Sequence, residues 1–222
     1  MKIEPHSEDK AEVNSLTRRL VNNKMKIAVE DHGAKSKKLK LNRAINQIFR
    51  TSGSSRQNAL LLYRFSNYFK PKTTLELGTS LGFGTLHLFL GHPDSHIITI
   101  EGCPQTYQIA KSNLENKPID LINKTFNDAI DTLNPEKIDL IFIDGHHDGN
   151  ALKQYIKKLD SRIHENTVLI LDDIRWSDSM LTAWNELRNS AEFNLSMDFF
   201  KMGVLMKRPQ QRKEHFYLRI KK

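Results

Sequence analysis

Cysteine is almost absent from this chain of 222 residues, since Cys103 is the single one. One thiol cannot form an internal disulfide framework, and it cannot supply a zinc site built on several cysteines. Disulfide-rich secreted domains are therefore excluded. We expect a fold that depends on an ordinary hydrophobic core.

Long apolar runs are missing as well. No segment approaches the roughly 18 apolar residues that a membrane-spanning helix needs, and the polar first residues, MKIEPHSEDKAEV, lack the apolar centre of a secretory signal. With 38% hydrophobic and 27% charged residues, the composition is typical of an ordinary globular domain. We expect a cytoplasmic protein without a membrane partner.

Basic residues outnumber acidic ones at the two ends of the chain. Residues 1–50 carry a net charge of +6 and residues 201–222 a net charge of +7, whereas residues 51–200 carry −5. Basic ends of this kind can bind RNA or anionic surfaces, but more often they are simply solvated. A nucleic acid is therefore the less favoured partner.

The middle of the chain alternates between short apolar segments and amphipathic ones. The predicted strands lie at residues 73–77, 96–100, 120–124, 139–143 and 167–171. The predicted helices lie at residues 57–69, 85–90, 104–114, 151–159 and 179–188. This alternation is typical of a parallel sheet covered by helices on both faces. Residues 194–200 and 202–207 are too close together for a helical crossover, so they predict an antiparallel hairpin.

The segment before residue 55 has a different pattern. Leu16, Leu20, Met25 and Val29 recur at near-helical spacing, which predicts a helix within residues 1–35. A basic connector at residues 36–40 precedes a second predicted helix at residues 41–49. Ser55 is a suitable N-cap for the helix that follows.

A glycine-rich segment, ELGTSLGFG, follows the first predicted strand. Ligands of open α/β sheets bind at the carboxyl ends of the strands, where glycines let the backbone approach a ligand closely. The spacing of Gly78, Gly82 and Gly84 differs from the Gly-x-Gly-x-x-Gly of dinucleotide binders. Glu76 would be unfavourable beside a pyrophosphate, but it suits a ligand with a positive charge, such as an ammonium or a sulfonium group.

Polar residues also follow the next two predicted strands. Glu101 ends the second strand, where a carboxylate can accept hydrogen bonds from both hydroxyls of a ribose. Asn127 and Asp128 follow the third strand, where an amide or a carboxylate can bind an adenine edge. Asn-Asp is also a common turn sequence, so this pair is the weaker indication.

Five segments together resemble the class I S-adenosylmethionine-dependent methyltransferases. They read ELGTSLGFGT, IITIEGCP, FND, LIFIDGHHD and LILDDIRWSDSMLTAW, and within that superfamily they are similar to the catechol O-methyltransferase-like group and bacterial small-molecule O-methyltransferases. The resemblance covers roughly residues 55–207. It implies an α/β fold with a doubly wound, seven-stranded, mostly parallel Rossmann-like sheet that ends in an antiparallel hairpin.

The resemblance also implies a division of the chain and a set of cofactor contacts. Residues 55–222 would form the methyltransferase domain, and residues 1–54 a helical extension that caps the substrate or forms an interface, such as that of a homodimer. The cofactor would be S-adenosylmethionine. By position its contacts would be Glu76, Gly78, Thr79, Ser80 and Gly82 near the methionine part, Glu101 at the ribose, and Gly102, Cys103, Asn127 and Asp128 around the adenine, with Asp144 beside them.

The acidic ends of the fourth and fifth strands raise the question of a metal. In metal-dependent members an acid after the fourth strand and an acidic pair after the fifth bind Mg²⁺, and Asp144, Asp172 and Asp173 match these positions. Alternatively, these acids only order loops and cap turns. Where those members have a lysine this chain has His147, so His147 or His146 would serve as the general base near Asp144.

Two other functions stay open at this point. A nicotinamide-dependent oxidoreductase is disfavoured by the glycine spacing and by the absence of a Tyr-x-x-x-Lys pair at Tyr155. An RNA-modifying or RNA-binding protein would use the basic ends, but the Asp/Asn-Pro-Pro-aromatic motif of RNA base methyltransferases is absent at residues 144–147. We favour O-methylation of a small molecule, with Trp184 in the core and Trp176 lining the substrate pocket.

Overall fold

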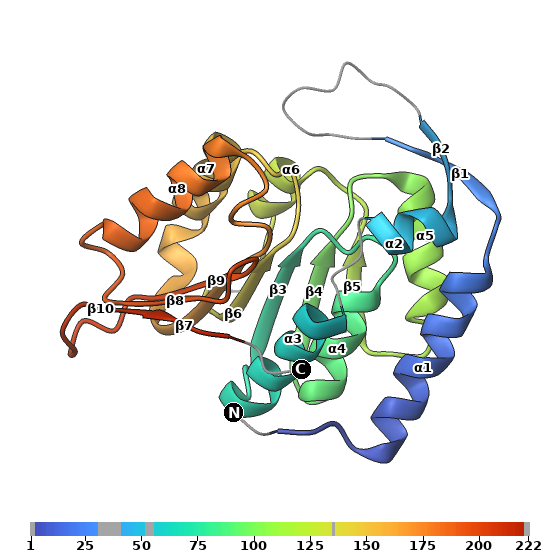
Figure 1. Ribbon diagram of the computed structural model, residues 1–222, viewed down its shortest axis with the longest axis horizontal. Coiled ribbons are helices and arrows are strands. Elements are labelled where there is room, and N and C mark those ends of the chain that lie inside the picture. Colours follow the sequence, from blue (N-terminus) through green and yellow to red (C-terminus); the bar gives the residue numbers. More distant parts are fainter. Residues whose placement is uncertain (1–2, 31–40, 52–55, 135, 220–222) are drawn as a thin grey trace.

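A computed structural model describes residues 3–30, 41–51, 56–134 and 136–219 of the chain (Figure 1). Its centre is an eight-stranded sheet with the order β10-β8-β9-β7-β6-β3-β4-β5. Helices cover both faces of this sheet, as the alternating apolar segments predict. No helix within the described ranges combines the length and the apolar character needed to cross a membrane.

Five parallel strands form the middle and one side of the sheet, and all five predicted strands are confirmed. They are β3 (Thr73–Leu77), β4 (His96–Ile100), β5 (Ile119–Ile122), β6 (Ile138–Ile143) and β7 (Ile163–Leu171). These strands are rich in β-branched residues, and the central ones are buried on both faces. Their carboxyl ends therefore lie along one edge of the sheet.

The other side of the sheet contains the antiparallel strands. The hairpin of β8 (Leu195–Asp198) and β9 (Gly203–Met206) is confirmed, and β9 also pairs antiparallel with β7. A further strand, β10 (Glu214–Tyr217), runs parallel to β8 at the edge and is additional to the seven predicted strands. Its side chains are mostly exposed, so no buried apolar pattern indicates it.

Six helices follow the start of the sheet domain. They are α3 (Arg56–Phe69), α4 (Phe83–Gly91), α5 (Pro104–Asn113), α6 (Phe126–Ile130), α7 (Gly149–Leu159) and α8 (Asp178–Asn189). Five of them match the predicted helices, and α6 is a single extra turn capped by Thr125. The predicted N-cap Ser55 and the basic connector at 36–40 lie outside the described residues.

The N-terminal segment departs from its prediction. Helix α1 (Ser7–Asn22) ends well before Val29, and β1 (Lys26–Val29) pairs antiparallel with β2 (Leu41–Ala44). Helix α2 (Ile45–Thr51) starts four residues later than expected. The helix prediction is wrong beyond residue 22 because Asn23 leaves the helical conformation and its side chain accepts a hydrogen bond from the backbone of Met25.

The N-terminal segment nevertheless shares its core with the sheet domain. Buried Leu16 and Leu20 of α1, with Ile45 and Ile48 of α2, belong to one apolar cluster. Most other members come from α3, α4 and the loop before α4, with one from the end of α5: Ala59, Tyr63, Leu81, Phe83, Leu86, Leu90 and Leu114. Because α1 and α2 bury these apolar side chains against the sheet domain, the N-terminal segment and the sheet domain stabilise each other.

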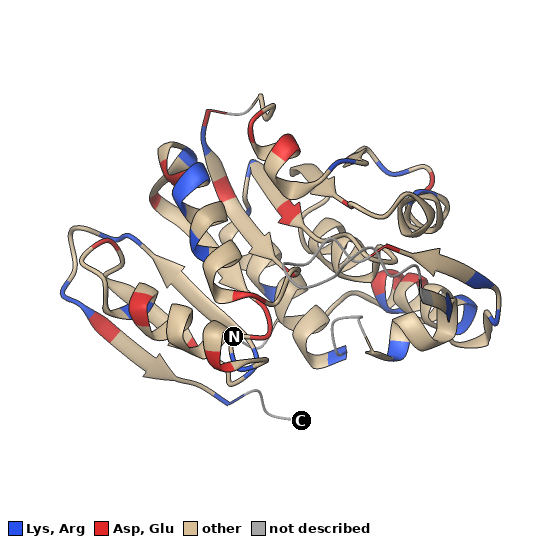
Figure 2. Ribbon diagram, turned by 90° about the horizontal axis from the view of Figure 1, so that it is seen from above, with Lys and Arg blue, Asp and Glu red and all other residues tan. Residues whose placement is uncertain are grey.

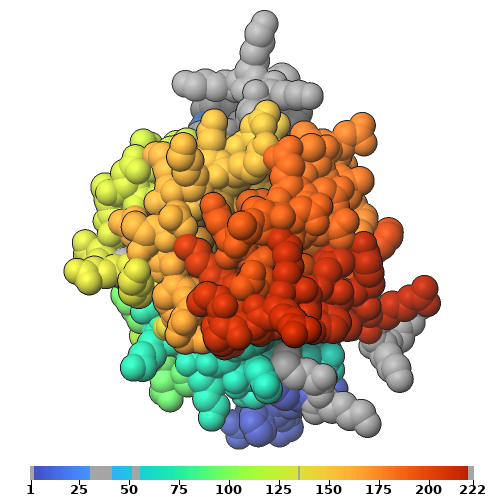
Figure 3. All heavy atoms as spheres, turned by 90° about the vertical axis from the view of Figure 1, so that its left-hand side faces the viewer, coloured from blue at the N-terminus to red at the C-terminus, as the bar shows by residue number. Residues whose placement is uncertain are grey.

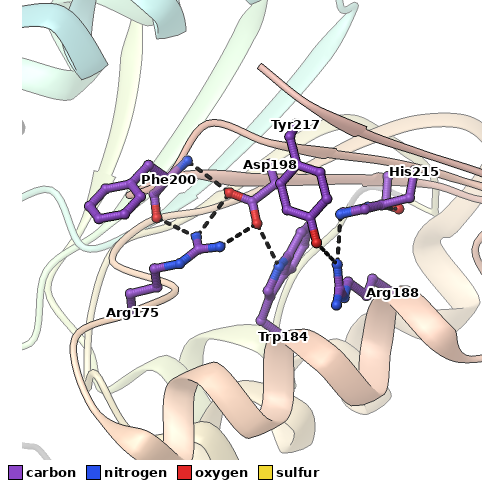
Figure 4. A network of polar contacts seen from close by, with 8 residues as sticks. Arg175, Trp184, Arg188, Asp198, Phe200, His215 and Tyr217 are labelled. Carbon is purple, nitrogen blue, oxygen red and sulfur yellow. Dashed lines mark hydrogen bonds and ion pairs between the residues drawn. The ribbon is translucent and has the colours of Figure 1, made fainter. Parts of the chain in front are cut away.

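Atoms of the C-terminal part of the chain, in orange and red, lie together on the face of the molecule that Figure 3 shows. Asp198 of β8 is 2% exposed and accepts two hydrogen bonds from Arg175 and one from Trp184 (Figure 4). Burial raises the pKa of Asp198, but the hydrogen bonds from Arg175 and the Phe200 backbone outweigh it and leave the pKa below its ordinary value. Trp184 is fully buried, as predicted.

A second group of contacts ties β10 to α8. Arg188 donates to the hydroxyl of Tyr217 across 2.9 Å and lies 2.6 Å from Nε2 of His215 (Figure 4).

Basic residues occur at both ends of the molecule, and acidic residues lie among them (Figure 2). In this view neither end therefore carries charges of a single sign.

Candidate active site

Four strand ends meet where the sequence predicts the site. Hydrogen bonds between backbone groups join them: the N–H of Asp144 donates to the carbonyl of Leu77 across 2.9 Å, that of Gly78 to Ile100 across 3.0 Å, and that of Asp172 to Ile143 across 3.0 Å. Loops that follow β3, β4, β6 and β7 therefore start side by side. The structure brings the predicted residues Gly78, Glu101, Asp144 and Asp172 to one edge of the sheet.

The glycine turn after β3 is required by close backbone contact. Gly78 has a φ of +109°, and a Cβ built on it would lie 1.8 Å from the carbonyl oxygen of Asp144. A side chain at this position would therefore force the two strand ends apart. Ser80 has a φ of +50°, in the region that favours glycine, and it stands where many of the resembling enzymes have glycine.

Glu76 is fully buried among hydroxyl groups. Its Oε2 accepts hydrogen bonds from Thr85 and Thr99, each across 2.5 Å. Because Thr99 donates its proton to Glu76, Thr79 must donate to Thr99, at 2.6 Å between the hydroxyl oxygens. The side chain of Thr79 thus belongs to this network, while its backbone N–H donates to Ile100 across 3.2 Å and its carbonyl accepts from Gly82 across 2.9 Å.

One carboxylate oxygen of Glu76 has no partner. Within the described part of the chain, Oε1 is buried and makes no hydrogen bond. A Cβ on Gly84 would lie 3.0 Å from this oxygen. Burial raises the pKa of Glu76 to about 7, against the lowering effect of the two threonine hydrogen bonds.

Glu101 is held by two backbone donors. Its Oε2 accepts from the N–H of Ser80 and its Oε1 from the N–H of Cys103, both across 2.9 Å. Burial raises the pKa of Glu101 to about 7, although both hydrogen bonds lower it. Since a carboxylate has about four acceptor positions, further positions stay available to a ligand.

Cys103 and Gly102 follow Glu101 at the start of α5. The thiol of Cys103 is buried, donates to the carbonyl of Ala28 and accepts from the N–H of Glu30 across 3.4 Å. Its side chain therefore packs against β1 of the N-terminal segment. Asn123, which the sequence analysis missed, donates to the carbonyls of Glu101 and Gly102 across 2.7 and 3.3 Å. Its one sequence signal is a polar side chain directly after a strand.

Two of the four residues predicted near the adenine lie on the short helix α6. Asn127 and Asp128 are both exposed. Asp128 accepts a hydrogen bond from the hydroxyl of Thr125 across 2.7 Å and is thereby part of the helix cap. Phe126 beside them is partly buried, and a Cβ on Gly145 would lie 2.7 Å from its ring.

Burial and neighbouring negative charges raise the pKa of two acidic side chains that follow β6 and β7. Burial, followed by the negative charges of Asp172 and Asp173, raises the pKa of Asp144 well above its ordinary value. Burial and the charge of Asp173 raise the pKa of Asp172 to about 6. Oδ1 of Asp172 accepts hydrogen bonds from the side chain of Asn58 across 3.2 Å and from the Asp173 N–H across 2.9 Å.

These acids do not converge as metal ligands. Among the residues that the structure describes, no three His, Cys, Asp or Glu side chains are grouped so that they could hold a metal ion. The Mg²⁺ site at Asp144, Asp172 and Asp173 therefore stays a prediction from the sequence. Oδ1 of Asp172 is taken by Asn58 and the backbone, and Asp173 lies toward His147, with 3.9 Å between its Oδ2 and the ring Nδ1.

His146 and His147 are adjacent in the loop between β6 and α7, but their rings have different surroundings. His147 lies beside Asp173, and its ring centroid is 5.1 Å from that of Trp176, which is 63% exposed. His146 stacks on Tyr155 with 5.5 Å between the ring centroids, and its Nδ1 is hydrogen-bonded to the Tyr155 hydroxyl. The φ of His146 is +63° and that of His147 is +35°. Tight loops with strained backbone are typical of functional sites.

Solved structures of methyltransferases share the fold of this chain. The methyltransferase PaMTH1 of Podospora anserina, crystallised with SAH, is 18% identical, with a TM-score of 0.62 over 93% of this chain and 99% of that one. The O-methyltransferase of Bacillus cereus in complex with SAH is 16% identical, with a TM-score of 0.63 over 93% and 94% of the two chains. At such identities, the likeness shows the fold.

A third structure and the family comparison lead to the same fold. The O-methyltransferase TomG of Streptomyces achromogenes, in complex with SAM, is 16% identical with a TM-score of 0.62, over 72% of this chain and 86% of that one. No curated protein matches the sequence. The family model for the methyltransferase domain matches residues 75–174, which run from β3 past the end of β7. That segment therefore matches the methyltransferase domain family, and the chain shares the fold of these methyltransferase structures.

Proposed function

We propose that this chain transfers a methyl group from S-adenosylmethionine to a hydroxyl group of a small molecule. The observation that carries the proposal is the pair of carboxylates beside the glycine turn. Glu76 has a buried oxygen without a donor among the described residues, and Glu101 is oriented by two backbone N–H groups. The first suits the charged amino-acid end of the cofactor, and the second suits its ribose hydroxyls.

Each predicted contact has a role in this proposal. Glu76, Gly78, Ser80, Gly82 and the backbone of Thr79 would line the methionine part. Glu101 would hold the ribose, and Gly102, the backbone of Cys103 and Asn127 or Asp128 would lie around the adenine. The SAH and SAM complexes of the fungal and bacterial methyltransferases support the choice of cofactor.

The reaction would occur between the cofactor loop and the histidine loop. Bound S-adenosylmethionine supplies a methyl group on a positively charged sulfur. As the acceptor oxygen bonds to the methyl carbon, the carbon–sulfur bond breaks and its electron pair stays on the sulfur. The hydroxyl proton passes to His147 or His146, near Asp144. Trp176 would form one wall of the acceptor site, because its ring lies against His147.

A transfer assay with radiolabelled methyl groups tests the proposal. The chain is incubated with methyl-tritiated S-adenosylmethionine and, separately, with catechols, phenols, aliphatic hydroxy acids and total RNA. We expect labelled product from at least one small hydroxyl compound. Label that enters only RNA would overturn the small-molecule assignment, and no incorporation with any acceptor would count against methyl transfer itself.

A further inference from the structure

Tyr155 lies beside the histidine loop and has no role in the reaction as proposed so far. It is on α7, 2% exposed, and its ring contacts those of His146 and Phe126. The centroid distances are 5.5 Å to His146, in a stacked arrangement, and 5.6 Å to Phe126, edge to face. Phe126 also contacts the His146 ring at 5.3 Å. These ring contacts fix the plane of the His146 imidazole.

The direction of the hydrogen bond between Tyr155 and His146 follows from burial. A buried hydroxyl needs an acceptor, because an unsatisfied donor costs about 1–3 kcal/mol. The Tyr155 hydroxyl is hydrogen-bonded to Nδ1 of His146. Burial and the nearby charge of Asp148 raise the pKa of Tyr155 to about 12, so the hydroxyl keeps its proton at neutral pH. Tyr155 therefore donates, and Nδ1 of His146 accepts.

A neutral imidazole has one nitrogen that donates and one that accepts. If Nδ1 of His146 accepts from Tyr155, its proton is on Nε2 and its lone pair is already engaged. His147 differs, because its Nδ1 lies 3.9 Å from a carboxylate oxygen of Asp173. A carboxylate on that side favours a proton on Nδ1 and leaves Nε2 as the acceptor.

We infer that Tyr155 is a positioning residue that holds His146 as the Nε2–H tautomer, so that His146 can only donate a hydrogen bond and His147 takes the proton of the acceptor. The inference rests on the proposed function for the role of His147. The tautomer of His146 follows from its contact with Tyr155 and does not depend on the proposed function. The two rings lie in separate environments, one on Tyr155 and one on Trp176.

Nitrogen NMR of the histidine rings tests the tautomer without any reaction. The chain is labelled with ¹⁵N-histidine, and the His146 signals are identified by their loss in His146→Gln. At pH 7.5 we expect the Nε2–H pattern for His146, with an unprotonated Nδ1. In Tyr155→Phe, which keeps the ring and removes the hydroxyl, we expect a mixture of tautomers. An Nδ1–H pattern in the wild-type protein would overturn the inference, whether or not methyl transfer is found.

Measurements of kcat distinguish the roles of His146 and His147. We expect both histidine variants to lower kcat: His147→Gln at least about 100-fold, as loss of a general base does, and His146→Gln by a smaller factor, because glutamine retains a donor near the position of Nε2. Tyr155→Phe is expected to lower kcat with the KM for S-adenosylmethionine unchanged. The reverse order of the two histidine variants would overturn the assignment of roles. Absence of turnover in the wild-type chain would refute the proposed function and leave the NMR result as the test of the tautomer.

Discussion

The carboxylate of Glu101 accepts a hydrogen bond from the backbone N–H of Ser80, and 2.9 Å separate the two atoms. Ser80 makes this contact from a left-handed conformation, with a φ of +50°. The loop after β3 and the end of β4 are therefore joined through a side chain that has further acceptor positions. A ligand that binds Glu101 meets a carboxylate whose orientation is already fixed.

Replacement of Glu101 by glutamine should weaken cofactor binding. The variant loses the charge, and its amide nitrogen cannot accept from the N–H of Ser80 or Cys103. Hydrogen bonds to a charged group contribute about 1.5–3 kcal/mol, so we expect the affinity for S-adenosylhomocysteine to fall about 10- to 100-fold in isothermal titration. The matched control is Glu115→Gln, since Glu115 is exposed and distant from the site in sequence. Equal affinities for the two variants would show that Glu101 does not hold the ligand.

Glu76 should make the stability of the ligand-free protein fall as the pH rises. Its pKa is about 7 in the folded protein, against 4.5 for an unperturbed glutamate side chain, so between these values the folded state binds more protons than the unfolded state. By linkage, the free energy of unfolding decreases across this window, and the penalty is complete above pH 7. The Glu76→Gln variant has no such penalty, and its amide oxygen can still accept from Thr85 and Thr99.

Urea unfolding of the wild type and of Glu76→Gln at pH 5 and pH 8 measures this effect. We expect the variant to gain about 1 to 3 kcal/mol relative to the wild type between the two pH values. Other titrating groups occur in both proteins and cancel in the difference. A difference that is independent of pH, or that has the opposite sign, would contradict the raised pKa of Glu76.

Truncation of Leu20 should destabilise the whole protein. Leu20 is 2% exposed and belongs to the cluster that joins α1 to α3 and α4. Leu20→Ala is therefore expected to cost about 2–5 kcal/mol of unfolding free energy, in one transition. Arg19→Ala, at an exposed neighbouring position, should change it little. A separate early transition in the Leu20 variant would indicate that the N-terminal segment folds independently.

Loss of Arg175 should leave Asp198 buried without its ionic partner. The two side chains are joined by hydrogen bonds of 2.9 and 2.6 Å, and Asp198 is 2% exposed. Because the side chain of Arg175 is 29% exposed, solvent reduces the effect, and we expect Arg175→Leu to cost about 2–3 kcal/mol at pH 7. Chemical denaturation measures it, with the exposed Arg212→Leu as the control. Similar stability of the two variants would contradict the role of Arg175 as the ionic partner.

The sheet could be predicted from the sequence because its strands are apolar on both faces. HIITI, DLIFI and TVLIL have no polar face that an amphipathic helix would need, and each is followed by an acidic residue at the strand end. The N-terminal hairpin could not be predicted in this way. Its four-residue strands carry charged residues, and pairing across the intervening residues is a tertiary effect that spacing does not show.

The place of the site could be predicted from the sequence, but the contacts of its side chains could be predicted less well. Gly78, Glu101, Asp144 and Asp172 lie at one edge because parallel strands place them there. The direction of a side chain is decided by partners that are distant in sequence: Thr79 is bonded to Thr99, the thiol of Cys103 packs on β1, and Asn58 of α3 holds Asp172. For the same reason, no pattern in the sequence indicates the contact between Tyr155 and His146, which only the fold brings together.

The most direct test is isothermal titration of S-adenosylhomocysteine into the wild-type chain, with NADH as the comparison ligand. We expect saturable binding of one S-adenosylhomocysteine per chain and none of NADH, because the glycine turn lies between the buried carboxylate of Glu76 and the partly buried carboxylate of Glu101. Binding of NADH, or no binding of S-adenosylhomocysteine, would contradict the assignment of this edge of the sheet as an S-adenosylmethionine site.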